Sequence, residues 1–238
     1  MEYKTFLDTK RKTFIESGFE LNESDLNKDL KDFQKYGIKT ALFKGRFAFF
    51  FDCGLGKTFS QLEWANQVVK RTFQPVLILA PLAIVDQTIR EGVKFGYEVG
   101  KLDANELPSE RMIYIINYDQ LKNIDCSVYS GVVLDESSIL KGRDGKMSSL
   151  ILESFKNTPY KLCCTATPSP NDHMELGQHS EFLGGMSYLE MLAMFFVHDG
   201  GETSKWRLRK HAKDAFWKYV SSWSMAIDTP ASLGFCDE

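Results

Sequence analysis

The chain has 238 residues, of which 43% are hydrophobic and 26% are charged. These are ordinary values for a soluble globular protein, and the length fits one large domain or a domain and a half with a proper core. The net charge of −3 does not indicate a nucleic-acid binder at the level of the whole chain, although a local basic groove is compatible with it.

The cysteines and the N-terminus indicate a cytoplasmic protein. Five cysteines, with no Cys-x-x-Cys pair, exclude a disulfide framework and favour reduced thiols in a cytosolic compartment. The N-terminus lacks an apolar signal region, and no apolar run is long enough to cross a bilayer. We therefore expect a soluble protein without a membrane partner.

The first 45 residues predict helices. Residues 2–17 form one expected helix, with Gly18 as its stop, and residues 24–36 form a second. A third, short helix is expected to carry Ala41 and Leu42 towards Gly45.

From residue 47 onwards, short apolar runs alternate with amphipathic helical segments. The apolar runs cover residues 47–51, 76–80, 112–117, 132–135 and 161–165, and the helical segments cover 58–70, 82–95 and 148–156. Nearly continuous apolar runs are typical of strands covered on both faces. The alternation predicts an α/β fold of three layers with a mostly parallel sheet, whose ligands bind at the carboxyl ends of the strands.

Residues 186–227 differ in composition from this core. They are rich in Met, Phe and Trp, and a turn is expected at 199–201. We predict four parts: helices over 1–45, the α/β domain with its ligand site over 46–185, an aromatic-rich appendage packed on the core over 186–227, and a linker over 228–238.

The first apolar run leads into Asp52-Cys53-Gly54-Leu55-Gly56-Lys57-Thr58. A strand, a glycine-rich turn, Lys-Thr and a helix together are typical of a phosphate-binding loop. The backbone N–H groups of residues 54–58 would donate to phosphate oxygens, Lys57 would reach the β- and γ-phosphates, and the Thr58 hydroxyl would ligate Mg²⁺. Phe51 stands where the strict pattern has its first glycine.

Asp135 and Glu136 directly follow the fourth apolar run. A carboxylate at the end of a buried strand is costly unless it meets a cation, and phosphate-bound Mg²⁺ is such a cation. Asp135 would hold the metal, directly or through water, while Glu136 would orient and deprotonate the attacking water. Taken alone, the pair could equally be a helix cap.

Two further polar sites fit a nucleotide. Thr165 and Thr167, within Thr-Ala-Thr-Pro, follow the fifth apolar run, where a capped strand end is the simpler interpretation of the motif alone. Upstream, Gln34 offers a donor and an acceptor, which suits an adenine edge.

The order of these motifs resembles the first motor domain of superfamily 2 helicases and translocases, closest to the Swi/Snf-like and phage-encoded members. The resemblance covers roughly residues 26–238. It rests on a Q-motif-like stretch (residues 30–34), motif I (52–58), a motif Ia-like Ala80-Pro81-Leu82, Asn117-Tyr118 at a later strand end, a DEAH-type motif II (135–138) and motif III (165–168), with 169–172 similar to the phage group. In motif II, Ser137-Ser138 replaces Ala-His.

This resemblance implies a RecA-like P-loop NTPase domain that uses ATP and Mg²⁺. The implied catalytic residues are Lys57, Asp135 and Glu136, and Thr165 and Thr167 would report the γ-phosphate to a second RecA-like domain. The implied track is DNA, with RNA possible, and a phage-encoded protein would work in the host cytoplasm. Because the second domain supplies arginine fingers in this family, the chain alone is expected to bind nucleotide, hydrolyse it poorly and not translocate.

Two questions stay open at this stage. The chain could instead be a nucleotide-gated module that binds DNA or a partner protein without appreciable turnover; a P-loop kinase or GTPase is disfavoured because it leaves Thr-Ala-Thr-Pro unexplained. Residues 205–211 place Trp206 among cations, so this segment could bind nucleic acid or be a solvated hairpin edge with one packed Trp.

Overall fold

The computed structural model describes residues 16–102, 108–109, 112–141, 145–169, 172–198 and 206–235. The predicted helix over 2–17 lies outside these residues except for its last two positions, which are not helical. The predicted turn at 199–201, and residues 170, 171, 205 and 236–238, also lie outside the described residues.

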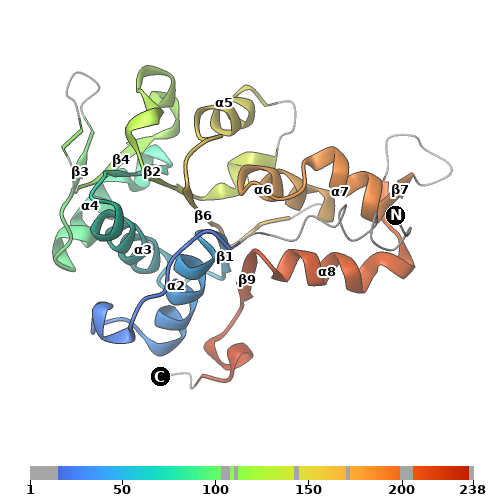
Figure 1. The fold of residues 1–238 in the computed structure, drawn as a ribbon, viewed down its shortest axis with the longest axis horizontal. Coiled ribbons are helices and arrows are strands. Elements are labelled where there is room, and N and C mark those ends of the chain that lie inside the picture. Colours follow the sequence, from blue (N-terminus) through green and yellow to red (C-terminus); the bar gives the residue numbers. More distant parts are fainter. Residues whose placement is uncertain are drawn as a thin grey trace, which may run out of the picture.

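A seven-stranded sheet of parallel neighbours forms the centre of the molecule (Figure 1). Its strands follow the spatial order β3-β4-β2-β5-β6-β1-β9. The strands are β1 (Arg46–Phe51), β2 (Val76–Ala80), β3 (Val99–Lys101), β4 (Ile113–Asn117), β5 (Gly131–Asp135), β6 (Tyr160–Cys164) and β9 (Ser224–Ile227). The five predicted strands are confirmed, and β3 and β9 are additional.

Helices cover both faces of the sheet, which confirms the three-layer α/β prediction. One face packs against α2 (Asp32–Lys44), α3 (Lys57–Thr72) and α4 (Leu82–Lys94). The other packs against α5 (Lys146–Ser154), α6 (Leu176–Phe182), α7 (Tyr188–Phe195) and α8 (Lys213–Ser221). The strand period of two divides β1 between the two cores: Phe47, Phe49 and Phe51 join the first, and Ala48 and Phe50 join the second.

The predicted helix over 24–36 is wrong, and so is the separate short helix before Gly45. Only Glu23–Asp25 forms a short 3₁₀ helix, and one continuous helix, α2, begins at Asp32 and passes through Gly37 to Lys44. Gly37 stays in the helix because this helix approaches β1 closely there: a Cβ at this position would lie 3.3 Å from the Phe51 ring.

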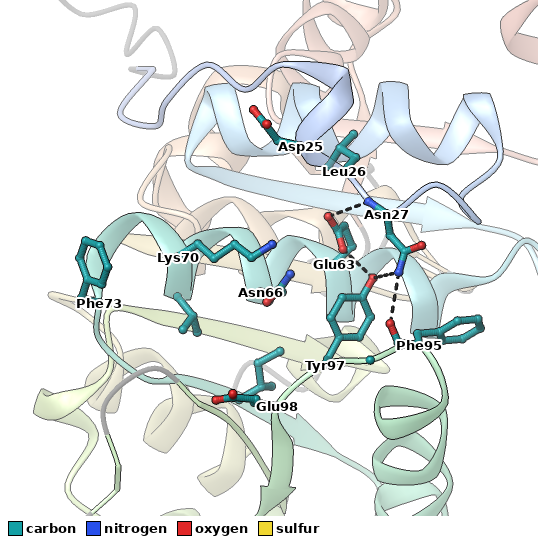
Figure 2. Close-up of a pocket in the computed structure, with 13 residues that line it drawn as sticks. Asp25, Leu26, Asn27, Glu63, Asn66, Lys70, Phe73, Phe95, Tyr97 and Glu98 are labelled. Carbon is teal, nitrogen blue, oxygen red and sulfur yellow. Dashed lines mark hydrogen bonds between the residues drawn. The ribbon is translucent and has the colours of Figure 1, made fainter.

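Asn27 explains why no helix forms across residues 26–31. Its side-chain oxygen accepts the backbone N–H of Asp29, which is a local turn that competes with helix, and its backbone N–H donates to Glu63 of α3. The Asn27 amide also donates to the Tyr97 hydroxyl and to the Phe95 carbonyl, both in the turn between α4 and β3 (Figure 2). These long-range bonds fix the N-terminal segment against the sheet's helices.

Part of the predicted appendage belongs to the central sheet. β9 pairs in parallel with β1 from Ala48↔Ser224 to Phe51↔Ile227, so the sheet continues beyond the boundary predicted at residue 185. Before it, β7 (Phe196–His198) and β8 (Trp206–Leu208) form an antiparallel pair.

After β9 the chain turns back onto α2. Pro230–Leu233 forms a 3₁₀ helix, and the Phe235 ring lies 6.0 Å from that of Tyr36. Across the described parts of the chain, no helix combines the length and the apolar character needed to cross a membrane.

Candidate nucleotide-binding site

The predicted site residues converge on one edge of the sheet. β5, β6 and β1 are neighbours in space, and because they are parallel, their carboxyl ends meet at the same edge. The phosphate-loop residues follow β1, Asp135 ends β5, and Thr165 follows β6. Sequence segments more than 100 residues apart are therefore brought together where α/β sheets bind ligands.

Two glycines give the phosphate loop its shape. Gly54 has a φ of 85° and Gly56 a φ of 68°, a region that side chains other than glycine rarely adopt. Gly56 precedes the first residue of α3, and a Cβ there would lie 2.4 Å from the Gln34 amide nitrogen. The backbone N–H groups in the first turn of α3 have no acceptor within the helix and face the loop, as an anion requires.

The Lys57 ammonium is held by its own loop. Its Nζ donates to the carbonyl of Phe51 at 2.9 Å and to that of Asp52 at 3.1 Å. Thr58 lies beside it, half-buried, in the first turn of α3. If Lys57 bound a phosphate, its ammonium would leave two neutral carbonyl acceptors and donate to charged oxygens, which form stronger hydrogen bonds.

Gln34 is buried, and both ends of its amide are used. Its Nε2 donates to the carbonyls of Leu55 and Gly56, at 3.2 and 3.4 Å, and its Oε1 accepts the backbone N–H of Lys31 at 2.9 Å. In this arrangement Gln34 joins the start of α2 to the phosphate loop. Adenine recognition by Gln34 stays a prediction.

Asp135 is a buried carboxylate beside the phosphate loop. Burial raises its pKa above the ordinary value, and Glu136 adds to this, whereas the neighbouring Gln61 amide and the Lys57 charge act in the opposite direction. The hydroxyl of Tyr118 donates to the Asp135 carbonyl at 2.8 Å, behind the carboxylate. A divalent cation would supply the positive charge that favours the ionised carboxylate here.

Glu136 joins motif II to motif III. Its backbone φ is 61°, a left-handed conformation that is strained for a residue with a side chain. Its Oε1 accepts the Thr165 hydroxyl at 2.7 Å and the Ser138 hydroxyl at 2.5 Å. The Thr165 Oγ1 in turn accepts the backbone N–H of Thr167 at 3.0 Å. The Thr167 side chain itself is exposed.

A buried histidine supports the same loop from α6. His179 Nε2 lies 3.1 Å from the Ser137 hydroxyl, and its Nδ1 lies 3.5 Å from the Glu175 carbonyl, which can only accept. In the neutral ring Nδ1 therefore carries the proton and Nε2 accepts from Ser137. Burial lowers the pKa of His179 to about 4, so the ring stays neutral at physiological pH.

The residues at this edge fit a magnesium nucleotide. They combine a glycine loop at a helix N-terminus, a lysine, a hydroxyl in the first helical turn and a buried carboxylate without an ion-pair partner among the described residues. Phosphate and a hard divalent cation require this donor set. The individual roles predicted for these residues stay predictions.

Sequence reasoning missed three residues at this site: Gln61, Ser138 and His179. Ser138 was noted only as a departure from the family motif. His179 lies 42 residues from its partner Ser137, so no local pattern could have joined them. Gln61 follows Lys57 by four positions in a helix, and this spacing could have indicated that both lie on the same helix face.

The fold is shared with an ATPase core and a helicase of known structure. The ATPase core of the Sulfolobus solfataricus SWI2/SNF2 protein, solved in complex with dsDNA, superposes with a TM-score of 0.75 at 20% identity, covering 92% of this chain. The same core domain in a second structure gives 0.69 at 20% identity, again over 92% of this chain. The UvsW helicase from bacteriophage T4 gives 0.54 at 15% identity, covering 78% of this chain and 66% of its own.

These likenesses show a RecA-like α/β fold. No protein-family model and no curated protein sequence matches the chain. The chain spans about half the length of the two SWI2/SNF2 structures, 48% and 50%.

Proposed function

We propose that the chain is the ATP-binding motor domain of a DNA helicase or translocase. The observation that carries this proposal is the meeting of Lys57, Thr58, Asp135, Glu136 and Thr165 at one carboxyl edge of a RecA-like sheet. The likeness to a SWI2/SNF2 ATPase core that was solved with dsDNA supports DNA as the nucleic acid.

Each residue has a distinct task in this proposal. Backbone N–H groups of residues 54–58 and the Lys57 ammonium bind the phosphates, and Gln34 places the loop against the adenine side. Asp135 and Thr58 hold Mg²⁺, which supplies charge neutralisation for the transferred phosphoryl group when it is bound. Glu136 accepts a proton from the attacking water, and Thr165 holds the Glu136 carboxylate in position.

Movement on nucleic acid requires a second RecA-like domain in the proposed mechanism. An arginine from such a domain contributes roughly 10³–10⁵ to the rate of related phosphoryl transfers. In the proposal, Thr165 and Thr167 carry the state of the γ-phosphate towards that domain through the Glu136–Thr165 hydrogen bond.

Nucleotide binding by the isolated chain is the direct test. A fluorescent ATP analogue should bind in the presence of Mg²⁺, and Lys57→Ala should weaken this binding by roughly 10–100-fold, because hydrogen bonds to charged phosphate are lost. Glu136→Gln serves as the matched control, since it keeps nucleotide binding within about threefold and lowers residual hydrolysis by roughly 10²–10⁴. Absence of Mg²⁺-dependent binding to the wild-type chain would reject the proposal.

The same samples address the alternative of a nucleotide-gated binding module. Turnover that rises with DNA and falls in Glu136→Gln supports the motor. Nucleotide-dependent DNA or protein binding together with linear, DNA-independent, near-background hydrolysis supports the module.

A further inference from the structure

Gln61 carries a buried amide that makes no well-formed hydrogen bond. The residue lies in the second turn of α3 and is fully buried. Among the described residues, neither its Oε1 nor its Nε2 makes a hydrogen bond of good geometry, although the amide lies close enough to the Asp135 carboxylate to lower the pKa of that group. A buried, unsatisfied amide destabilises a folded protein, so its presence calls for a reason outside packing.

The position of Gln61 supplies that reason. Helical spacing of three and four places it on the same face of α3 as Thr58 and Lys57. On the other side it neighbours the Asp135 carboxylate, which ends β5 and faces α3. The amide therefore lies beside the Asp135 carboxylate and on the helix face that carries Thr58.

We propose that Gln61 is a positioning residue for the metal-binding carboxylate of Asp135. Its Nε2–H₂ would donate to Asp135 and fix the direction of this carboxylate, and its Oε1 would remain free to accept a further hydrogen bond when the metal nucleotide is bound. This inference rests on the proposed function, because the direction of the Asp135 carboxylate matters in this way only if Asp135 holds a metal. Partners of metal ligands commonly act in this way, and their loss costs roughly 10–100-fold in metal affinity.

The chain offers a matched control on the same helix. Gln67 is also buried, but its Nε2 donates to Glu63 at 2.7 Å and to the Asp25 carbonyl at 2.8 Å. Replacing either glutamine by methionine keeps the side-chain volume and removes the amide. Of the two substitutions, only the one at Gln67 removes well-formed hydrogen bonds that exist without nucleotide.

The experiment combines thermal unfolding without nucleotide and Mn²⁺ titration by electron paramagnetic resonance in the presence of a non-hydrolysable ATP analogue. Gln61→Met should raise Tm by about 2–4 °C, because an unsatisfied amide is removed, and should weaken Mn²⁺ binding by roughly 10–100-fold. Gln67→Met should lower Tm and leave Mn²⁺ binding unchanged.

The outcomes separate this inference from the proposed function. Unchanged Mn²⁺ affinity in Gln61→Met overturns the role of Gln61, whatever happens to Tm. A loss of affinity that accompanies a fall in Tm also overturns it, because damage to α3 then explains both. If the wild-type chain binds no nucleotide with Mn²⁺, it is the proposed function that fails.

Discussion

At the scale of single residues, the candidate site is held by hydrogen bonds that cross between motifs. Glu136 sits in a left-handed conformation and is supported by hydroxyls of Ser138 and Thr165, while Ser137 is supported by His179 from α6. Local strain of this kind persists only where the surroundings fix it. The loop after β5 is therefore set by residues from three separate parts of the chain.

His179 makes the stability of the folded protein dependent on pH. The pKa of His179 is lowered by burial to about 4 in the folded protein, whereas an unfolded histidine titrates near 6.5. Between these values the unfolded chain binds a proton that the folded chain does not, so stability falls as pH falls from about 6.5 to about 4. The expected contribution is about 1.4 kcal/mol per pH unit and about 3 kcal/mol in total.

Urea unfolding at several pH values measures this effect. His179→Gln, which keeps a polar group opposite Ser137, should flatten the fall in the free energy of unfolding over this window. His211→Gln, at an exposed position, should leave the wild-type dependence unchanged. Parallel curves for wild type and His179→Gln would contradict the assignment of the pH dependence to His179.

At the scale of elements, the N-terminal segment depends on a buried cluster of polar groups. The Tyr97 hydroxyl donates to Glu63 Oε2 and accepts from the Asn27 amide, which joins α3, the α4–β3 turn and residues 26–31 (Figure 2). Burial and the Glu63 carboxylate raise the pKa of Tyr97 well above its ordinary range, so the phenol stays protonated. A cavity of about 580 Å³ lies beside this cluster.

Tyr97→Phe removes the hydroxyl and leaves a buried carboxylate with one donor fewer. We expect a loss of about 1.5–3 kcal/mol in the free energy of unfolding, because the bond is made to a charged group. Tyr36→Phe is the control, since Tyr36 is half-exposed, and we expect a change within about 0.5 kcal/mol. Equal, small effects in both variants would show that the cluster does not hold the segment.

The same cluster explains how far the sequence could predict the elements. Runs such as 76–80 predicted β2 to the residue, because a strand buried on both faces is continuously apolar. The prediction of a helix over 24–36 was wrong because Asn27 forms hydrogen bonds with Glu63 and Tyr97, which lie far away in the sequence. β9 was missed because four residues, two of them buried, carry little signal before they pair with β1.

The type of chemistry at the site could be predicted from the sequence, but the contacts between the site residues could not. Glycine, lysine and carboxylate types at strand ends predicted phosphate and metal chemistry, since few other residue types perform it. Adenine recognition by Gln34 stays a prediction, while its hydrogen bonds to the carbonyls of Leu55 and Gly56 could not be predicted, because residue types do not reveal a loop conformation. The His179 and Gln61 contacts arise only once the sheet is assembled.

At the scale of the whole molecule, positive charge is concentrated on one segment of a chain that is negative overall. Residues 206–218 contain five Lys or Arg and one acidic residue, against a net charge of −3 for the chain. Trp206 packs against His198, with ring centroids 3.7 Å apart. The Trp217 side chain, on α8, is 39% exposed. The more exposed of these two indole rings is therefore that of Trp217 on α8.

This segment is where the open question about nucleic acid can be decided. If it binds nucleic acid, exchanging Lys213 and Lys218 for glutamine removes two phosphate contacts, and the slope of log K against log salt should fall by about 1.8 for duplex DNA. Lys70→Gln with Lys94→Gln, at the exposed C-terminal ends of α3 and α4, is the charge-matched control and should keep the wild-type slope. Fluorescence anisotropy with labelled duplex and single-stranded 20-mers at several salt concentrations measures both slopes. Identical slopes for the two double variants would assign residues 206–218 to a solvated edge, and any DNA contact would then have to lie elsewhere on the domain.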